Sequence, residues 1–90
     1  GKIAFGADSV ENSIKKKLVK LVILAEDSSD RTKDKFKKIC EQFHIPMIQI
    51  ADIETLSKAI GKKNKAILGI QDINLSKEIE KIYNGGEVLG

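Results

Sequence analysis

Cysteine, histidine and aromatic residues are scarce in this 90-residue chain, and each scarcity argues against a class of protein. The single cysteine, Cys40, cannot form an internal disulfide, so nothing argues for secretion. One cysteine and one histidine, His44, are too few for a zinc site of the usual Cys/His kind. Aromatic residues make up only 4% of the chain, which argues against the base-stacking platforms of RRM and OB domains.

Long apolar runs and targeting signals are missing as well. No run approaches the roughly 18 residues of a membrane span, and no signal-peptide pattern opens the chain. The sequence therefore predicts a cytoplasmic protein with no membrane partner. The glycines do not cluster as in phosphate-binding or dinucleotide-binding loops, so no cofactor is expected. Residues 1–90 fit one domain; because the chain starts at Gly1 without an initiator Met, we expect an upstream segment to be missing.

The charges that are present are unevenly distributed. Charged residues make up 32% of the chain and the net charge is +3. Residues 1–65 hold 14 Lys/Arg against 9 Asp/Glu, whereas residues 66–90 hold 2 against 4. This asymmetry favours an anionic partner for the first two-thirds of the chain, although lysine-rich helices are often simply solvated faces.

Short apolar runs alternate with amphipathic stripes. Runs at 18–25, 47–51 and 66–70 are rich in Ile, Val and Leu, which is typical of strands covered on both faces, and 3–5 is a weaker edge strand. Stripes with helical spacing lie between and after them, with Asp8 or Ser9 expected to cap the first helix. The alternation predicts an α/β sandwich with a four-stranded, mostly parallel mixed sheet.

The other expected helix boundaries follow from single residues. Asp27, Ser28 or Ser29 can cap the second helix. Gly61 is expected to stop the third helix, whose stripe is Leu56, Ala59 and Ile60, and Gly85 and Gly86 to stop the fourth, whose stripe is Leu75, Ile79, Ile82 and Tyr83.

Two constellations could carry catalysis, and each has a simpler structural interpretation. The spacing of Cys40 and His44 places both on one helical face, but no third group is evident to orient the histidine. Three acidic residues after a strand could hold magnesium and accept a phosphoryl group, yet carboxylates there also stabilise the next helix. These residues are Glu26, Asp27 and Asp30. We therefore expect neither a catalytic nor a metal site, and no enzyme.

Two features favour RNA. A glycine turn at 5–9 leads from the edge strand into a helix, where Gly6 allows close backbone approach and the helix N-terminus offers N–H groups to phosphate. The short polar side chains that follow this glycine could reach base edges. The second feature is a basic loop directly before a strand, although such a loop is more often a solvated turn. Its residues are Lys62, Lys63, Asn64 and Lys65.

The chain also resembles a known family. The segment GKIAFGADSVENSIKKKLVKLVILAEDSSDRTKDKF and the later IADIETLSKAIGKKNKAILGI resemble the ribosomal L7Ae/L30e kink-turn-binding family, in the right order and over nearly the whole chain. The bacterial ribosomal-protein-like members are the most similar branch. The resemblance implies a three-layer α/β/α sandwich. It also implies binding of kink-turn RNA, a bent helix–internal loop–helix with tandem sheared G·A pairs. It implies a ribosome- or RNP-associated protein.

Carried over by position, the resemblance implies two sets of RNA-binding residues. The set that reads the G·A pairs is Gly6, Ala7, Asp8, Ser9 and Asn12. The set that contacts the flipped-out nucleotide is Lys62, Lys63 and Asn64, with Lys65 beside it. Where the family has an Asn-Glu pair followed by Lys, this chain has Asp8, Ser9 and Asn12, and Asp8 can only accept hydrogen bonds. Lys15, Lys16, Lys20 and the Lys62–Lys65 loop are expected to compensate its charge.

These departures leave two alternatives open. The chain could be a protein-interaction or scaffold module that kept the fold without specific RNA readout, or the RNA-substrate domain of a methyltransferase. Family members also usually begin with an apolar helix, little of which can precede Gly1. We therefore expect reduced stability or self-association through the apolar strip that this helix would cover.

Overall fold

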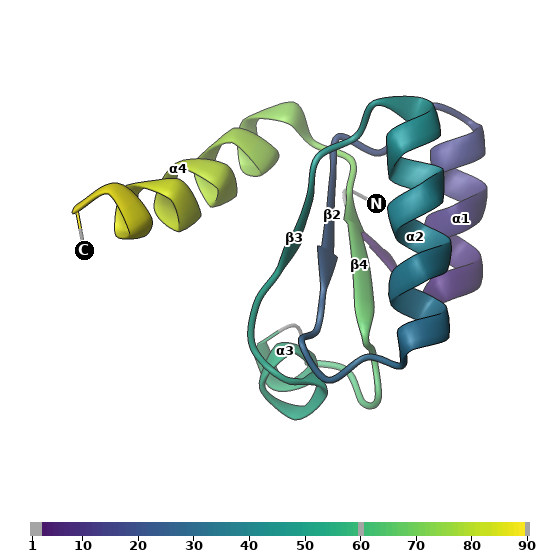
Figure 1. The fold of residues 1–90 in the computed structure, drawn as a ribbon, viewed down its shortest axis with the longest axis horizontal. Coiled ribbons are helices and arrows are strands. Elements are labelled where there is room, and N and C mark those ends of the chain that lie inside the picture. Colours follow the sequence, from purple (N-terminus) through teal and green to yellow (C-terminus); the bar gives the residue numbers. More distant parts are fainter. Residues whose placement is uncertain (1–2, 60, 90) are drawn as a thin grey trace.

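Strands and helices alternate strictly in the computed structural model, which describes residues 3–59 and 61–89. The strands are β1 (Ile3–Phe5), β2 (Leu21–Leu24), β3 (Met47–Gln49) and β4 (Ile67–Ile70). The helices are α1 (Ala7–Lys15), α2 (Asp30–Phe43), α3 (Ile53–Ala59) and α4 (Ile73–Leu89) (Figure 1). Every predicted element is present, with β2 and β3 shorter than the apolar runs that predicted them.

The strands form one mixed sheet in the order β1-β4-β2-β3, which confirms the predicted α/β class. β2 pairs with β3 in parallel, whereas β4 is antiparallel to both β1 and β2. Three strands thus run in one direction, but the reversed β4 lies between two of them, so only one neighbouring pair is parallel. The expectation of mostly parallel pairing is corrected in this respect.

The length of α3 explains the reversal of β4. α1 and α2 run along the sheet and bring the chain back to the start of the next strand. α3 has only 7 residues and lies beyond the end of the sheet (Figure 1). It spans about 10 Å at 1.5 Å per residue, so β4 starts at the end where β3 finished and runs back. Alternation of elements in a sequence does not distinguish a crossover helix from an end helix.

Two apolar clusters cover the two faces of the sheet. On the α1/α2 face, Val10 and Ile14 meet Phe36 and Cys40, all of them buried, over inward side chains of β2 and β4. On the other face, Leu56 of α3 and Leu75 and Ile79 of α4 pack on the sheet. Several apolar side chains on this second face are only partly buried; these are Ile3, Phe5, Ile48, Ile50 and Ile53. α3 lies beyond the end of the sheet and α4 leads away from it (Figure 1), so the third layer of the sandwich stays a prediction.

Several predicted helix boundaries are confirmed. Ser29 caps α2, its Oγ accepting the Thr32 N–H at 3.2 Å. Gly61 follows α3 with a φ of +71°. The C-cap of α2, which was not among the predicted boundaries, is His44 in the left-handed conformation. Ile60 and the side chains of Ile82 and Tyr83 lie outside the described residues.

Two other boundaries differ from prediction. α1 begins at Ala7 with Gly6 as its N-cap, so Asp8 and Ser9 lie inside the first turn. α4 continues through Gly85 and Gly86, because glycine costs a helix only about 1 kcal/mol and does not remove its hydrogen bonds. None of the described helices is both long enough and apolar enough to cross a bilayer.

Candidate functional site

The glycine turn and the basic loop meet at one end of the sheet. β1 leads into the turn at Gly6, and the loop 61–65 leads into β4, which pairs with β1. The Gly6 N–H donates to the Ile67 carbonyl oxygen at 3.0 Å. A Cβ added at Gly6 would lie 3.7 Å from Lys65 Nζ, so this ammonium group lies directly beside the glycine. We call this end, residues 5–9 with 61–65, the turn–loop surface.

The backbone of Gly6 shapes the turn. Its angles, φ +86° and ψ 160°, belong to a region that only glycine adopts readily. This conformation turns the chain from β1 into α1, and the Gly6 carbonyl oxygen then accepts the Val10 N–H at 3.0 Å. No side chain caps α1, so the N–H groups of its first turn point outward beside the exposed Ala7, Asp8 and Ser9.

Ser57 of α3 holds the basic loop in place. Its buried Oγ accepts the Lys65 N–H at 2.8 Å and donates to the Lys65 carbonyl oxygen at 3.2 Å. Its own carbonyl oxygen accepts the Lys62 N–H at 2.9 Å. Asn64 takes a left-handed φ of +54° between these contacts. Three hydrogen bonds to one residue therefore fix both ends of the loop.

A cation–π contact links the loop to the end of β1. The Lys62 ammonium lies 5.2 Å from the centroid of the Phe5 ring. Neither this contact nor the Ser57 bonds was predicted from the sequence. The available signals were weak: one small polar residue inside the apolar stripe of α3, and one aromatic residue at the end of an edge strand.

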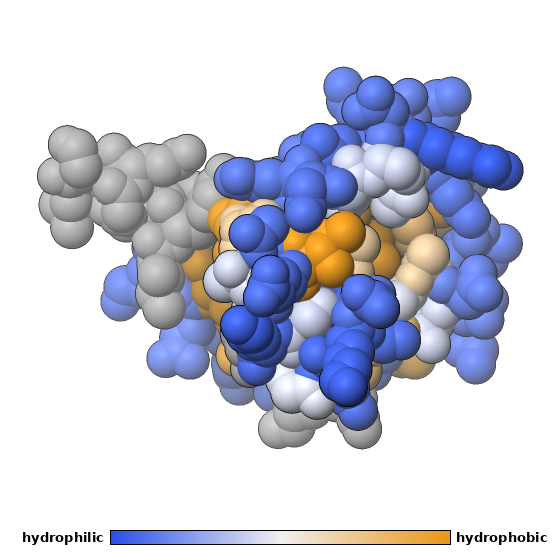
Figure 2. All heavy atoms as spheres, turned by 90° about the horizontal axis from the view of Figure 1, so that it is seen from below, coloured by the Kyte–Doolittle hydropathy of each residue, from blue (hydrophilic) through white to orange (hydrophobic). Residues whose placement is uncertain are grey.

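A hollow opens between α3 and the basic loop. Ile53 contributes apolar surface, Lys62 and Lys63 contribute ammonium groups, and Asn64 contributes an amide. Asp27 and Glu54 add carboxylates to the lining, and that of Glu54 pairs with Lys58 at 3.2 Å. Viewed from this end of the molecule, apolar surface is bordered by hydrophilic side chains (Figure 2). An apolar floor with cationic and amide groups at its edge is chemically suited to an aromatic base attached to a phosphate.

The acidic residues after β2 stabilise helix starts. Asp27 Oδ1 accepts the Ile53 N–H at 2.7 Å and so caps α3, not α2. Asp52 Oδ1 accepts the Thr55 N–H at 2.7 Å, and this backbone hydrogen bond, with one from the Thr55 hydroxyl, lowers the pKa of the Asp52 carboxyl. Asp30 lies in the first turn of α2. Among the described residues no group of three potential metal ligands gathers, and Glu26 stays exposed.

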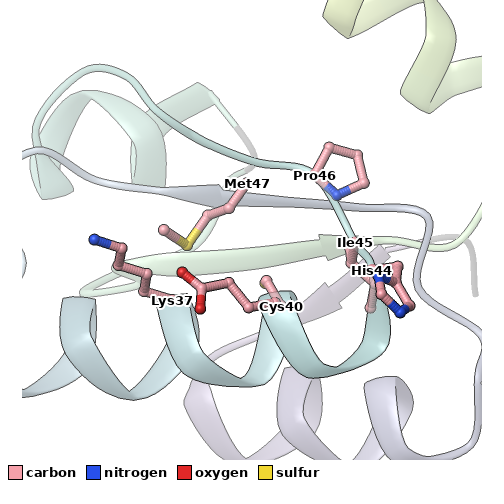
Figure 3. A pocket seen from close by; sticks show the side chains of 7 residues that line it. Lys37, Cys40, His44, Ile45, Pro46 and Met47 are labelled. Carbon is pink, nitrogen blue, oxygen red and sulfur yellow. The ribbon is translucent and has the colours of Figure 1, made fainter.

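Cys40 and His44 line a different hollow, between α2 and the start of β3 (Figure 3). His44 leaves the helix in a left-handed conformation, so the two residues do not share a helical face as their spacing predicted. Burial raises the pKa of the Cys40 thiol to about 11. At neutral pH this group is a thiol, not the thiolate that a nucleophile requires.

Lys15, Lys16 and Lys20 lie away from the turn–loop surface. Lys15 and Lys16 are at the C-terminal end of α1, and the Lys20 N–H donates to the carbonyl oxygen of Ile70, at the far end of β4. Lys15 also contacts Glu11 at 3.2 Å. The structure therefore brings Gly6 to Ser9 together with Lys62 to Lys65, places Asn12 further along α1, and does not bring these three lysines to them.

The fold and this surface define a small α/β domain with an open basic end. The family model described as "Ribosomal protein L7Ae/L30e/S12e/Gadd45 family" matches residues 1–80. The chain therefore belongs to this family, as the resemblance implied.

Individual relatives agree with this assignment. The chain is 27% identical over 78 residues to the "RNA-binding protein YlxQ" of Bacillus subtilis (strain 168), covering 87% of this chain and 78% of that protein. It is 27% identical over 85 residues to the protein of the same name from Enterococcus faecium, covering 94% and 82%. A solved structure, of a protein with unknown function from Bacillus halodurans C, superposes with a TM-score of 0.89 at 26% identity, covering 92% of this chain and 84% of that one.

Proposed function

We propose that this chain binds RNA through the turn–loop surface and recognises a kink-turn or a closely related bent RNA. The observation that carries the proposal is the contact between its two halves, with Lys65 Nζ beside Gly6. A sharply bent RNA presents two helical arms and an internal loop within a short distance, so a protein that reads it needs a glycine turn and a cationic loop side by side.

Each half has a distinct task. The uncapped first turn of α1 offers N–H groups to a phosphate, and Asp8 accepts hydrogen bonds from guanine N–H groups of a sheared pair. The lysines of the loop neutralise backbone phosphates, and the hollow bounded by Ile53 and Asn64 receives an extruded nucleotide. The chain acts by binding, with no bond made or broken. We propose that the RNA it binds belongs to a ribosome or another cytoplasmic RNP.

A gel-shift titration tests the proposal. The two RNAs are a kink-turn duplex and the same duplex with its G·A pairs replaced by Watson–Crick pairs. We expect the wild-type protein to bind the kink-turn at least tenfold more tightly, which corresponds to about 1.4 kcal/mol. Equal affinity for both RNAs would leave only non-specific binding and reject kink-turn recognition.

A triple variant, with Lys62, Lys63 and Lys65 each changed to Glu, shows where the RNA binds. We expect it to lose kink-turn binding and to keep its fold, since Lys62 and Lys63 are exposed. Lys33→Glu, Lys37→Glu and Lys38→Glu combined on α2 make the same change in net charge elsewhere. Equal losses from both triple variants would assign the effect to overall charge.

The second candidate function is a protein-interaction module without specific RNA readout. Asp8 favours it, because this carboxylate lies in the first turn of α1 at the turn–loop surface and brings negative charge toward any phosphate there. Asp8→Asn separates the two. Under the first proposal this substitution should tighten RNA binding. Under the second, the wild type has no specific RNA affinity and the substitution should not create one.

We further propose that the second face of the sheet, on which residues of α3 and α4 pack, supports self-association in this chain. The apolar side chains there, with Ile48 and Ile50 among them, remain partly open to solvent. Sedimentation equilibrium over a hundredfold range of concentration measures this. A constant monomer mass over the whole range contradicts the proposal.

A further inference from the structure

A second hollow, of about 640 Å³, opens at the end of the molecule opposite the turn–loop surface. It lies where the C-terminal ends of α1 and α2 approach the start of α4, at the upper end of the view in Figure 1. Its apolar lining is Ile14, Val19, Phe43, Ile45 and Ile73. Its polar lining is Lys17, Lys20, Gln42 and His44.

The apolar lining is not explained by the core alone. Ile14 and Val19 are buried and form the floor, but Ile73 is 48% exposed. Ile73 opens α4 directly after the Asp72 turn, and any small polar residue would serve at this first helical position. A large aliphatic side chain left open beside an aliphatic floor is typical of a surface that receives an apolar group.

The rim carries positive charge that the domain itself does not neutralise. Within the described ranges, Lys17 and Lys20 have no carboxylate within ion-pair distance, whereas nearby Lys15 contacts Glu11 at 3.2 Å. Lys16, in the same turn, is also exposed. The hollow thus combines an apolar floor with a cationic edge on one side.

We propose that this hollow binds an acidic peptide segment of a partner protein. A Leu, Ile or Phe side chain of the segment enters the hollow against Val19, Ile45 and Ile73, and flanking Asp or Glu carboxylates meet Lys17 and Lys20. Charge complementarity selects the acidic segment and sets its orientation, while the apolar side chain supplies most of the affinity.

The lining favours a peptide over a second RNA segment. Single-stranded RNA gains affinity by stacking bases on aromatic rings. This hollow offers the partly exposed Phe43 and the imidazole of His44, whereas most of its remaining lining is aliphatic. Phosphates alone would use the lysines but gain nothing from Ile73. Because the two surfaces lie at opposite ends of the sheet, a peptide and an RNA can bind together.

Peptide selection followed by mapping tests this inference. A random dodecapeptide library displayed on phage is selected on the immobilised full chain, and enriched peptides are synthesised and titrated while the methyl resonances of Ile14, Val19, Ile45 and Ile73 are followed. We expect enriched peptides to carry Asp or Glu on both sides of a Leu, Ile or Phe and to shift these methyl signals. Absence of enrichment, or enrichment of basic peptides, overturns the inference.

Matched variants locate the binding. Lys17→Glu and Ile73→Ala should each lower the affinity for the peptide by roughly fivefold or more. This is the change that losing about 1 kcal/mol of charge interaction or apolar contact implies. Lys38→Glu and Leu18→Ala make the same chemical changes at exposed positions that do not line the hollow, and should have no effect. Equal effects of both sets overturn the inference.

RNA serves as the competing ligand. A twelve-nucleotide oligouridine that shifts the same methyl signals more strongly than any peptide would assign the hollow to RNA instead and overturn the proposal. Kink-turn affinity, measured on the same variants, is expected to stay unchanged. The peptide result and the RNA-binding proposal can therefore fail independently.

Discussion

At the scale of single residues, Gly6 has the least replaceable backbone in the turn–loop surface. A methyl group would fit the space, since its nearest neighbour is Lys65 Nζ at 3.7 Å. The φ of +86°, however, is unfavourable for every residue with a Cβ. Conformation, not packing, therefore requires glycine here.

Gly6→Ala should lower the free energy of unfolding by about 1–3 kcal/mol, the usual cost of a side chain in such a region. Urea denaturation monitored by circular dichroism measures the change. Kink-turn affinity should fall as well, because the relaxed turn misplaces the first N–H groups of α1. A variant as stable as the wild type would show that the turn readily adopts another conformation.

Cys40 gives a second prediction at this scale, because burial raises its thiol pKa from 9.0 to about 11. Two pKa units leave about 100-fold less thiolate at pH 8. We expect the folded protein to react with an aromatic disulfide reagent at least about 100-fold more slowly than the protein unfolded in urea. Reaction at the same rate in both states would contradict the burial of this side chain.

At the scale of elements, α3 and the basic loop act as one unit because Ser57 joins them. Ser57→Ala would leave the Lys65 N–H without its acceptor, at a cost of about 1–3 kcal/mol. RNA affinity should fall by roughly fivefold to thirtyfold, since ordering a released residue on binding costs about 1–2 kcal/mol.

Ser76→Ala is the matched control for that prediction. Ser76 is also buried, and its hydroxyl donates to the Ile73 carbonyl oxygen at 2.9 Å, far from the loop. It should change stability without changing RNA affinity. Urea denaturation and gel-shift titration of both variants supply the two readouts, and parallel losses of affinity would argue against a positioning role for Ser57.

The contact between α1 and α2 predicts a dependence on pH. Hydrogen bonds from Lys35, at 2.8 Å, and then from Lys15 lower the pKa of the Glu11 carboxyl below its usual 4.5. A lowered folded pKa contributes stability above pH 4.5 that is lost as the pH falls through the folded value. Unfolding free energy should thus decline less between pH 6 and pH 3 in Glu11→Gln than in the wild type; identical declines would refute the contribution.

At the scale of the whole molecule, two groups of three lysines lie at opposite ends of the sheet. Lys62, Lys63 and Lys65 belong to the turn–loop surface, whereas Lys16, Lys17 and Lys20 lie at the other end. Only the first group can contact the same RNA bend as Gly6. The mild net charge of +3 therefore understates how basic each end is.

This division predicts the salt dependence of RNA binding. If about five phosphates are contacted, the logarithm of affinity should fall with the logarithm of salt concentration at a slope near −4. Changing the three loop lysines to Ala should reduce the magnitude of the slope by about three, one unit for each phosphate contact. The same changes at Lys16, Lys17 and Lys20 should leave the slope almost unaltered, and a filter-binding series in potassium chloride measures both.

Much of the fold could be predicted from the sequence, and the exceptions are instructive. The 3–5 edge strand and the helical stripe that begins with Leu75 and Ile79 were correct because period and residue type report burial directly. Asp8 or Ser9 was predicted to cap α1, but Gly6 is the N-cap. The reason is that the backbone conformation of Gly6 turns the chain from β1 into the helix, and this turn sets where the helix begins.

The sequence by itself determined the order of elements, the two apolar faces and the family, since these depend on local periodicity and on residues read in series. Only the tertiary structure decided that β4 runs antiparallel between β1 and β2. It also decided that Lys65 lies beside Gly6, whereas Lys20 lies at the other end of the sheet. The physical reason is that strand pairing joins residues some sixty positions apart, as Ile3 and Ile70 show, and no local pattern encodes that distance.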